Sequence, residues 1–243
     1  TNLSTSTVTV TGVIYDHAAG SISTNAVTLS NVIVGYSVVI STNLTLSNAA
    51  GLRVALDATN TFSDNTNLAL TGVGSITAGS STTTALTLAT GQGTGTYSNT
   101  VTVVFADASG LNGASTNLGS STVSMTGAIY DHASGSVGST NLTLSNWIVG
   151  YTGTVASTNS VTLSNAAGFR VALGASNASG VLNNVAGLGA GSSTNLSATL
   201  NATGIGTGTY SSNVTVIFGD SSSLVGASNN LGTTNIQLTG NVY

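Results

Sequence analysis

Apolar and hydroxyl-bearing residues alternate along most of the chain, which is the pattern of β-strands with one buried face. The clearest runs are VTVTG from Val8, VTVVF from Val101 and VTVIF from Val214, all composed of residues that favour strands. Clusters of Gly, Asn, Asp and Ser separate such runs about every ten residues, and no segment keeps a helical period. The pattern therefore predicts an all-β protein.

The two halves of the chain carry the same segments in the same order. LSNVIVGY at 29–36 returns as LSNWIVGY at 144–151, LSNAAGLRVAL at 46–56 as LSNAAGFRVAL at 163–173, GTGTYSNTVTVVFAD at 93–107 as GTGTYSSNVTVIFGD at 206–220, and LNGASTNLG at 111–119 as LVGASNNLG at 224–232. Tyr15 and Tyr130 are 115 positions apart, and Tyr130 and Tyr243 are 113 apart. The sequence is therefore a tandem duplication of a unit of ordinary domain size.

A strand of the form TGxxY occurs three times for two repeats, ending at Tyr15, Tyr130 and Tyr243. If each repeat ends at this tyrosine, the domains are 16–130 and 131–243, and 1–15 is a spare strand. If each repeat begins with the strand, 234–243 is left over instead. We favour the first division, which makes the N-terminal segment a candidate assembly strand with the side chains Val8, Val10, Val13, Ile14 and Tyr15.

Two all-β architectures compete for the repeats. A motif of the form STNxxTLSN occurs twice in each repeat at a spacing of 18, starting at Ser23 and Ser41 and again at Ser139 and Ser157. A β-solenoid would continue this period, but the rest of each repeat lacks it. The sequence thus predicts two tandem immunoglobulin-like antiparallel β-sandwiches of about eight strands each.

Charge is scarce, which excludes several kinds of partner. Charged residues make up 3% of the chain, the net charge is −4, and only two residues are basic. Nucleic acids and anionic membrane surfaces are bound through Lys and Arg, so we expect neither as a partner. No apolar run is long enough to span a bilayer, so we also expect no membrane insertion. Weak charge repulsion and edge strands without lysine favour self-association.

Most of the few ionisable residues recur in both repeats. The duplicated pairs are Asp16 and Asp131, His17 and His132, Arg53 and Arg170, and Asp107 and Asp220, whereas Asp57 and Asp64 are unique. We interpret Arg53 with Asp16 and Asp107, and Arg170 with Asp131 and Asp220, as structural charge pairs near strand ends. A Ca²⁺ site built on the same aspartates is the alternative, although no DxDxDG cluster is present and a nearby arginine opposes a cation.

Nothing in the sequence points to catalysis, a cofactor or a bound metal. His17 follows Asp16, but the chain has no G-x-S-x-G elbow for a hydrolase nucleophile. The Gly-rich segments at 91–95 and 204–208 precede valine strands rather than helices, so they are turns and not phosphate loops. Trp147, which replaces Val32 of the first repeat, is expected in the core rather than as a sugar-stacking platform.

The segment GLGAGSSTNLSATLNATGIGTGTYSSNVTVIF, at 187–218, resembles the second half of immunoglobulin-like repeats in bacterial surface proteins. These repeats belong to the choice-of-anchor-D and ASPM-SPD-2-Hydin group. LTLSNAAG at 44–51 and VSMTG at 123–127 are similar to other strands of that group, and the likeness covers about half of each repeat. The resemblance implies an extracellular structural or adhesive module without catalytic residues.

Together these features predict a secreted or cell-surface structural protein that is not an enzyme. We expect a subunit of a filament or surface layer that assembles head to tail with copies of itself by strand complementation. The alternative is an adhesin or carbohydrate-binding module within a longer repeat-containing surface protein, with a glycan as its partner.

Overall fold

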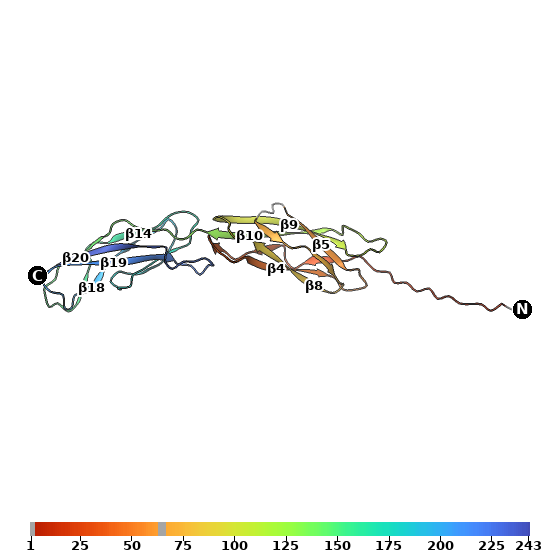
Figure 1. The fold of residues 1–243 in the computed structure, drawn as a ribbon, viewed down its shortest axis with the longest axis horizontal. Coiled ribbons are helices and arrows are strands. Elements are labelled where there is room, and N and C mark those ends of the chain that lie inside the picture. The colour runs from red at the N-terminus through yellow and green to blue at the C-terminus, as the bar shows by residue number, and fades with distance from the viewer. Residues whose placement is uncertain (1–2, 63–66) are drawn as a thin grey trace. The chain divides into compact units, whose positions relative to one another are not determined.

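A computed structural model describes residues 3–62 and 67–243, so Asp64 and the first two residues of the predicted assembly strand lie outside it. Every regular element in the described residues is a β-strand (Figure 1). The first repeat holds β1 (Gly20–Ile22), β2 (Ala26–Thr28), β3 (Val32–Ile33), β4 (Ile40–Asn48), β5 (Leu56–Phe62), β6 (Leu68–Leu70), β7 (Val73–Ile76), β8 (Ser81–Leu88), β9 (Gly95–Asp107) and β10 (Ser120–Tyr130). The all-β fold class predicted from the alternation is confirmed.

The second repeat holds the same number of strands as the first. They are β11 (Gly135–Val137), β12 (Asn141–Thr143), β13 (Thr154–Ala156), β14 (Val161–Asn165), β15 (Leu173–Ser176), β16 (Val185–Leu188), β17 (Ser193–Leu196), β18 (Thr199–Asn201), β19 (Gly208–Asp220) and β20 (Gly232–Val242). Each repeat thus has ten described strands rather than about eight. Several of them are only two or three residues long, which is too short for the alternation to reveal.

The chain folds into two compact units whose limits differ from those of the repeats. Unit 1 comprises Thr1–Ser30, Val39–Ala89 and Tyr97–Gly127, as far as these residues are described. Unit 2 comprises Asn31–Val38, Thr90–Thr96 and Ala128–Tyr243. Unit 2 therefore contains the second repeat together with the last residues of β10 and two short segments of the first repeat, one of which carries β3.

Unit 1 is built from two sheets. One has the strand order β1-β4-β8-β6, and the other runs β2-β10-β9-β5-β7 (Figure 1). Alternate side chains of both sheets are almost completely shielded from solvent, namely Leu44, Leu46, Leu86 and Leu88 in the first and Val101, Val103, Val123 and Met125 in the second. Burial of every second residue in both sheets is the arrangement of a sandwich, and the mainly antiparallel pairing excludes the solenoid.

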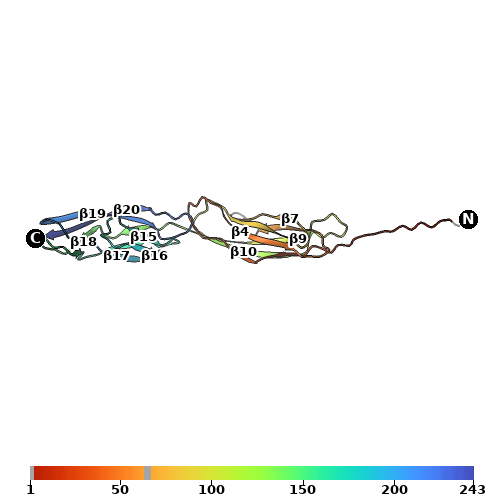
Figure 2. The same cartoon turned by 90° about the horizontal axis from the view of Figure 1, so that it is seen from below.

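Unit 2 repeats this plan with the sheets β11-β14-β17, β12-β20-β19-β15-β16 and β13-β18. Strands β19 and β20 lie side by side (Figure 2) and pair along their whole length, from Gly208 with Val242 to Phe218 with Gly232. Leu142, Leu163, Leu173, Ile236 and Leu238 are fully buried in its core. Ile33 from the first repeat belongs to the same core cluster.

The N-terminal TGxxY segment, which ends at Tyr15, forms no strand in this structure. The other two such segments belong to β10 and β20, which we call the closing strands. β10 lies between β9 and β2 in unit 1, and β20 lies between β19 and β12 in unit 2. Residues 5–15 have the same alternation as these strands, but the first described strand begins only at Gly20. The strand expected at Val8–Gly12 is therefore an extended segment without a ladder partner (Figures 1 and 2).

Candidate assembly surface

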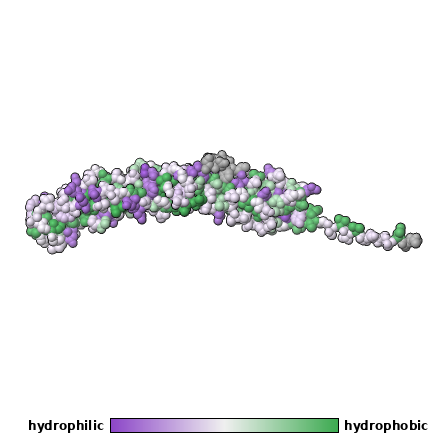
Figure 3. Space-filling model, in the orientation of Figure 1, coloured by the Kyte–Doolittle hydropathy of each residue, from purple (hydrophilic) through white to green (hydrophobic). Residues whose placement is uncertain are grey.

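The extended N-terminal segment exposes a row of apolar side chains. Val8 is 82% exposed, Val10 is 88% exposed and Ile14 is 92% exposed. Figure 3 shows apolar residues in green along this segment. Side chains at alternate positions of an extended chain point to the same side, so these three form one apolar edge with the hydroxyls of Thr7 and Thr9 opposite.

The same three positions are buried in both closing strands. Alignment on the final tyrosine matches Val8, Val10 and Ile14 with Val123, Met125 and Ile129 of β10, and with Ile236, Leu238 and Val242 of β20. All six of these counterparts are at most 4% exposed. The intervening position, Thr9, matches Ser124 and Gln237, which face solvent. The segment therefore has the side chains of a closing strand but not the burial of one.

A hollow of about 530 Å³ lies next to the end of this segment in unit 1. Its walls are Val13–His17 on one side and Leu111–Ala114 on the other. We call this space the hollow. Leu111 is 55% exposed in its wall, so the hollow opens to solvent and has apolar side chains beside the polar ones of Asp16, His17 and Asn112.

The corresponding place in unit 2 is filled by strand β3. Val32 and Ile33 pair in parallel with Ile129 and Tyr130 on one side, and Val32 forms a bridge with Val225 on the other. We call the space between Ile129–Tyr130 and Val225 the slot. The N–H of Ile33 donates to the carbonyl of Val225 at 2.9 Å, and the N–H of Val34 donates to the carbonyl of Tyr130 at 2.8 Å. Ile33 is completely buried there.

The surroundings of Gly226 in the slot and of its counterpart Gly113 in the hollow show that the first space is filled and the second is open. Both have a positive φ, +96° and +93°, that other residues rarely adopt. A Cβ added to Gly226 would lie 2.8 Å from the carbonyl oxygen of Ile33, whereas one added to Gly113 would meet no atom within 4 Å. The same backbone thus surrounds an inserted strand in unit 2 and open space in unit 1.

The counterpart of the β3 region in the second repeat is an exposed loop, Trp147–Tyr151, which we call the tip. The N–H of Val149 donates to the carbonyl of Tyr243 at 2.8 Å, and the N–H of Tyr243 donates to the carbonyl of Trp147 at 2.9 Å. These bonds attach the tip to the end of β20. Ile148 is nevertheless 72% exposed, while its counterpart Ile33 is buried.

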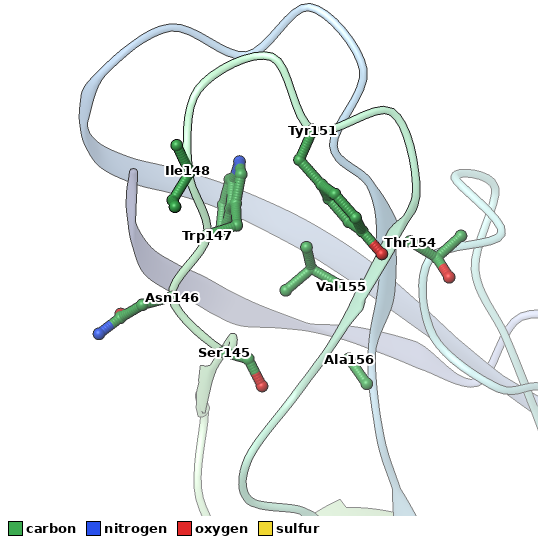
Figure 4. Close-up of a pocket in the computed structure, with 8 residues that line it drawn as sticks. All are labelled: Ser145, Asn146, Trp147, Ile148, Tyr151, Thr154, Val155 and Ala156. Atoms are coloured by element: carbon green, nitrogen blue, oxygen red, sulfur yellow. The ribbon is translucent and has the colours of Figure 1, made fainter. Parts of the chain in front are cut away.

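A second pocket, of about 400 Å³, lies beside the tip. Figure 4 shows the rings of Trp147 and Tyr151 on opposite sides of this space with Val155 between them. Trp147 is only 6% exposed, and its ring meets Tyr210 edge to face with centroids 6.0 Å apart. The indole therefore belongs to the core and does not offer an open face to a sugar ring.

Arginine and aspartate meet at the start of each repeat. Nη1 of Arg53 lies 3.1 Å from Oδ2 of Asp16 and donates to the carbonyl of His17 at 2.8 Å. In the second repeat Nη1 of Arg170 lies 3.0 Å from Oδ2 of Asp131 and donates to the carbonyl of His132. Each arginine thus ties the turn that follows TGxxY to the segment between β4 and β5, or between β14 and β15.

Asp107 and Asp220 contact histidine rather than arginine. Oδ2 of Asp107 is 2.6 Å from Nδ1 of His17, and its carboxylate accepts N–H bonds from Ala18 and Ser115 at 2.8 Å. Burial raises the pKa of Asp107, but these two N–H groups, the His17 hydrogen bond and its charge together hold that pKa below its ordinary value. Asp220 has the same partners, His132, Ala133 and Ser228.

In each repeat these charged groups hold a turn. The hydroxyl of Ser115 donates to the carbonyl of Asn117 and is not directed at His17. Within residues 3–62 and 67–243, no three His, Asp or Glu side chains gather closely enough to hold a metal ion. Over the same residues, no helix has the length and apolar character needed to cross a bilayer.

The structure brings only some of the predicted site residues together. Arg53 contacts Asp16 but not Asp107, and Arg170 contacts Asp131 but not Asp220. The assembly residues Val13, Ile14 and Tyr15 line the hollow, whereas Val8 and Val10 lie along the free segment. Sequence reasoning missed the hollow and the tip. Their segments were nevertheless visible as repeated strings: LNGAS and LVGAS form one wall of the hollow and of the slot, and WIVGY, the tip, repeats VIVGY.

Comparison with known proteins identifies no family for this chain. No family model and no curated protein matches it. The resemblance to choice-of-anchor-D repeats therefore stays a prediction.

Several solved structures that match are cadherin domains. The human desmocollin-1 ectodomain aligns with 93% of this chain at 9% identity and a TM-score of 0.48, and this chain spans 42% of that protein. The mouse cadherin-23 fragment EC22–24 has 10% identity and a TM-score of 0.40, and the match covers 93% of this chain and 67% of that one. A Porphyromonas gingivalis W83 protein of unknown function has 12% identity and a TM-score of 0.32, and the match covers 91% of this chain and 99% of that one. At these values the argument for function rests on the site itself.

Proposed function

We propose that this chain is a non-enzymatic structural protein, secreted or on a cell surface, that assembles with copies of itself by exchange of a closing strand. Residues 5–15 of one copy take the position of β20 in a second copy. The observation that carries this proposal is the contrast in burial between Val8, Val10 and Ile14 and their counterparts in β10 and β20.

The exchange is physically reasonable because the two strands are close to equivalent. In both, three apolar side chains alternate with polar ones and end in TGxxY. Full burial of a Val, Leu or Ile side chain contributes about 1.5–3 kcal/mol relative to exposure in water. Burying residues 5–15 in place of β20 regains most of what the displaced strand loses, and the ladder with β19 is rebuilt with main-chain hydrogen bonds that depend little on side-chain identity.

We take β20 rather than β10 as the strand that is displaced. β10 continues directly into Asp131 and the rest of the second repeat, so its displacement would disturb the fold of that repeat. Donor and acceptor are different surfaces of the molecule, so the contact is heterologous and each added copy leaves another donor and another acceptor free. This supports a head-to-tail filament or layer, with the chain itself as its partner.

A single buried charge tests the proposal. Val10→Asp would place a carboxylate where Met125 and Leu238 are fully buried, and burying an unpaired charge is strongly unfavourable. We expect this variant to remain monomeric under conditions in which the unmodified chain forms polymers. Analytical ultracentrifugation and negative-stain electron microscopy of both proteins would measure this difference. Because Val10 is 88% exposed in the monomer, its thermal unfolding should be unchanged.

The matched control is Thr9→Asp, the neighbouring residue on the opposite face. Its counterparts Ser124 and Gln237 are exposed, so this variant carries the same added charge and should still assemble. Polymers of normal length from Val10→Asp, or an unmodified chain that stays monomeric at every concentration, would contradict the proposed function.

A further inference from the structure

We propose that the hollow of one copy receives the tip of a second copy, with Ile148 in the place that Ile33 occupies in the slot of unit 2. The inference rests on the proposed self-assembly and adds a second, separate contact to it. It identifies the residues that select the partner, which strand exchange alone does not.

The walls of the hollow and the slot are the same two pieces of chain. Ile14 and Tyr15 correspond to Ile129 and Tyr130, and Leu111–Ala114 correspond to residues 224–227. In unit 2 these pieces hold a strand between them by parallel pairing on one side and a bridge on the other. In unit 1 the same pieces enclose about 530 Å³ of open space.

The tip has the sequence that the slot accepts. Residues 147–151 read WIVGY and residues 32–36 read VIVGY, so the two segments differ only at the first position. That position, Trp147, lies in the core of its own unit and does not need to enter the hollow. Ile148 is 72% exposed, Val149 is 50% exposed and Tyr151 is 48% exposed, whereas Ile33 and Tyr36 are buried.

Unused main-chain groups on the two surfaces match. In unit 2 the carbonyl of Val225 accepts from the N–H of Ile33. Within the described part of the chain, neither the N–H of Ile148 nor the carbonyl of Asn112, the two counterparts, forms a hydrogen bond. Docking of the tip joins this donor to this acceptor, as the N–H of Ile33 is joined to the carbonyl of Val225 in the slot.

The same docking links the hollow to strand exchange. Val149 donates its N–H to Tyr243 of its own copy, and its counterpart Val34 donates to Tyr130 at the wall of the slot. Tyr15 is the wall residue of the hollow, and its carbonyl has no partner in the described residues. When residues 5–15 replace β20, Val149 changes its acceptor from Tyr243 to Tyr15 of the incoming copy.

Two differences make the contact between copies weaker than the one within the chain. Asn112 stands where Val225 does, which makes the wall more polar. Leu52 stands where Phe169 stacks on Tyr130 with ring centroids 4.4 Å apart, so Tyr15 has no aromatic partner there. We therefore expect the contact between copies to be reversible, whereas the slot within the chain stays filled.

A complementation experiment tests the inference. Ile148→Asp disables the tip and leaves the hollow, whereas Leu111→Asp disables the hollow and leaves the tip. For each variant alone, the dissociation constant for self-association should be at least about tenfold higher than that of the unmodified chain. An equimolar mixture should form a pair of one copy of each and nothing longer, measured by mass photometry and sedimentation velocity.

Controls and alternative outcomes separate this inference from the proposed function. Thr152→Asp and Thr116→Asp add the same charge at exposed positions outside the tip and the hollow, and both should assemble normally. Full assembly of Ile148→Asp together with loss in Val10→Asp would overturn the docking of the tip and leave strand exchange standing. The reverse result would overturn strand exchange and leave the docking. Normal assembly of both variants would overturn both, as would a monomeric unmodified chain.

Discussion

Asp107 is the residue on which the N-terminal turn of unit 1 depends most. Its carboxylate is 1% exposed and accepts bonds from His17, Ala18 and Ser115, which come from segments about 90 residues apart in sequence. One ionised side chain therefore holds the turn after Tyr15 against the loop that forms the far wall of the hollow.

Acid should loosen this turn. The pKa of Asp107 is lower in the folded chain than in the unfolded chain, so the unfolded chain takes up a proton first as the pH falls. The stability that Asp107 contributes is fully present above about pH 5, roughly one unit above the pKa of an unfolded aspartate, and is lost as the pH falls through its folded pKa. Urea unfolding of the unmodified chain should show this loss between about pH 5 and pH 2.

Asp107→Asn provides the comparison for the acid effect. The amide keeps one acceptor oxygen but turns an NH₂ group toward backbone donors, so it should lower the free energy of unfolding by about 1–3 kcal/mol at neutral pH. The variant should also lose less stability in acid than the unmodified chain. An equal acid loss in both proteins would show that Asp107 does not carry the effect.

The sequence singled out a set of charged residues but did not indicate how they pair. Recurrence in both repeats singled out Arg53, Asp16 and Asp107 as one group. In the structure Arg53 takes Asp16, while Asp107 takes His17 and two backbone N–H groups. Whether Asp107 contacts Arg53 or His17 depends on how close the end of β9 lies to the turn after Tyr15. Alternation along one strand carries no information about that distance.

At the scale of the strand, β10, β20 and residues 5–15 are three copies of one element in different surroundings. Two have neighbours on both sides, and the third has none in the described chain. The alternation predicted the faces of β10 and β20 correctly, with Val123 and Met125 inward and Ser124 outward. It could not predict which copies are paired, because pairing depends on residues elsewhere in the chain.

Truncation of equivalent side chains should therefore have unequal effects in the monomer. Leu238→Ala removes a fully buried side chain of β20 and should lower the free energy of unfolding by about 2–5 kcal/mol. Val10→Ala removes its exposed counterpart and should change that free energy by less than about 0.5 kcal/mol. Chemical denaturation at concentrations where the chain is monomeric gives both values. A large effect of Val10→Ala there would mean that residues 5–15 already pack within their own copy.

At the scale of the whole molecule, the duplication and the sandwich architecture were both predictable. The repeated strings gave the two copies, and the spacing of turns gave the fold class. The division into compact units was less predictable, because Asn31–Val38 joins unit 2. Ile33 and Val225 are far apart in sequence, and nothing local in VIVGY indicates that its isoleucine belongs to the core of the other repeat.

Assembly of this molecule should be almost independent of salt. The net charge is −4 and only 3% of residues are charged, and the strand, the hollow and the tip are apolar or polar surfaces. The hollow carries the side chains of Asp16 and His17, which are already paired with Arg53 and Asp107. Salt screens interactions between exposed charges and therefore has little to screen here. The association constant, followed by light scattering, should change less than about threefold between low and high sodium chloride. A steep decrease with salt would mean that charged groups carry the contact.

The two arginines also determine how readily a protease can cut the chain. The sequence has no lysine and only these two arginines, so a protease of trypsin specificity has two bonds to attack. Each guanidinium is held by an aspartate and a histidine carbonyl, and the N–H of the residue that follows each, Val54 and Val171, bonds to that same aspartate's carbonyl. A protease needs an extended stretch of chain free of such bonds. The contacts that fix the turns therefore also protect the only two such cleavage sites from digestion.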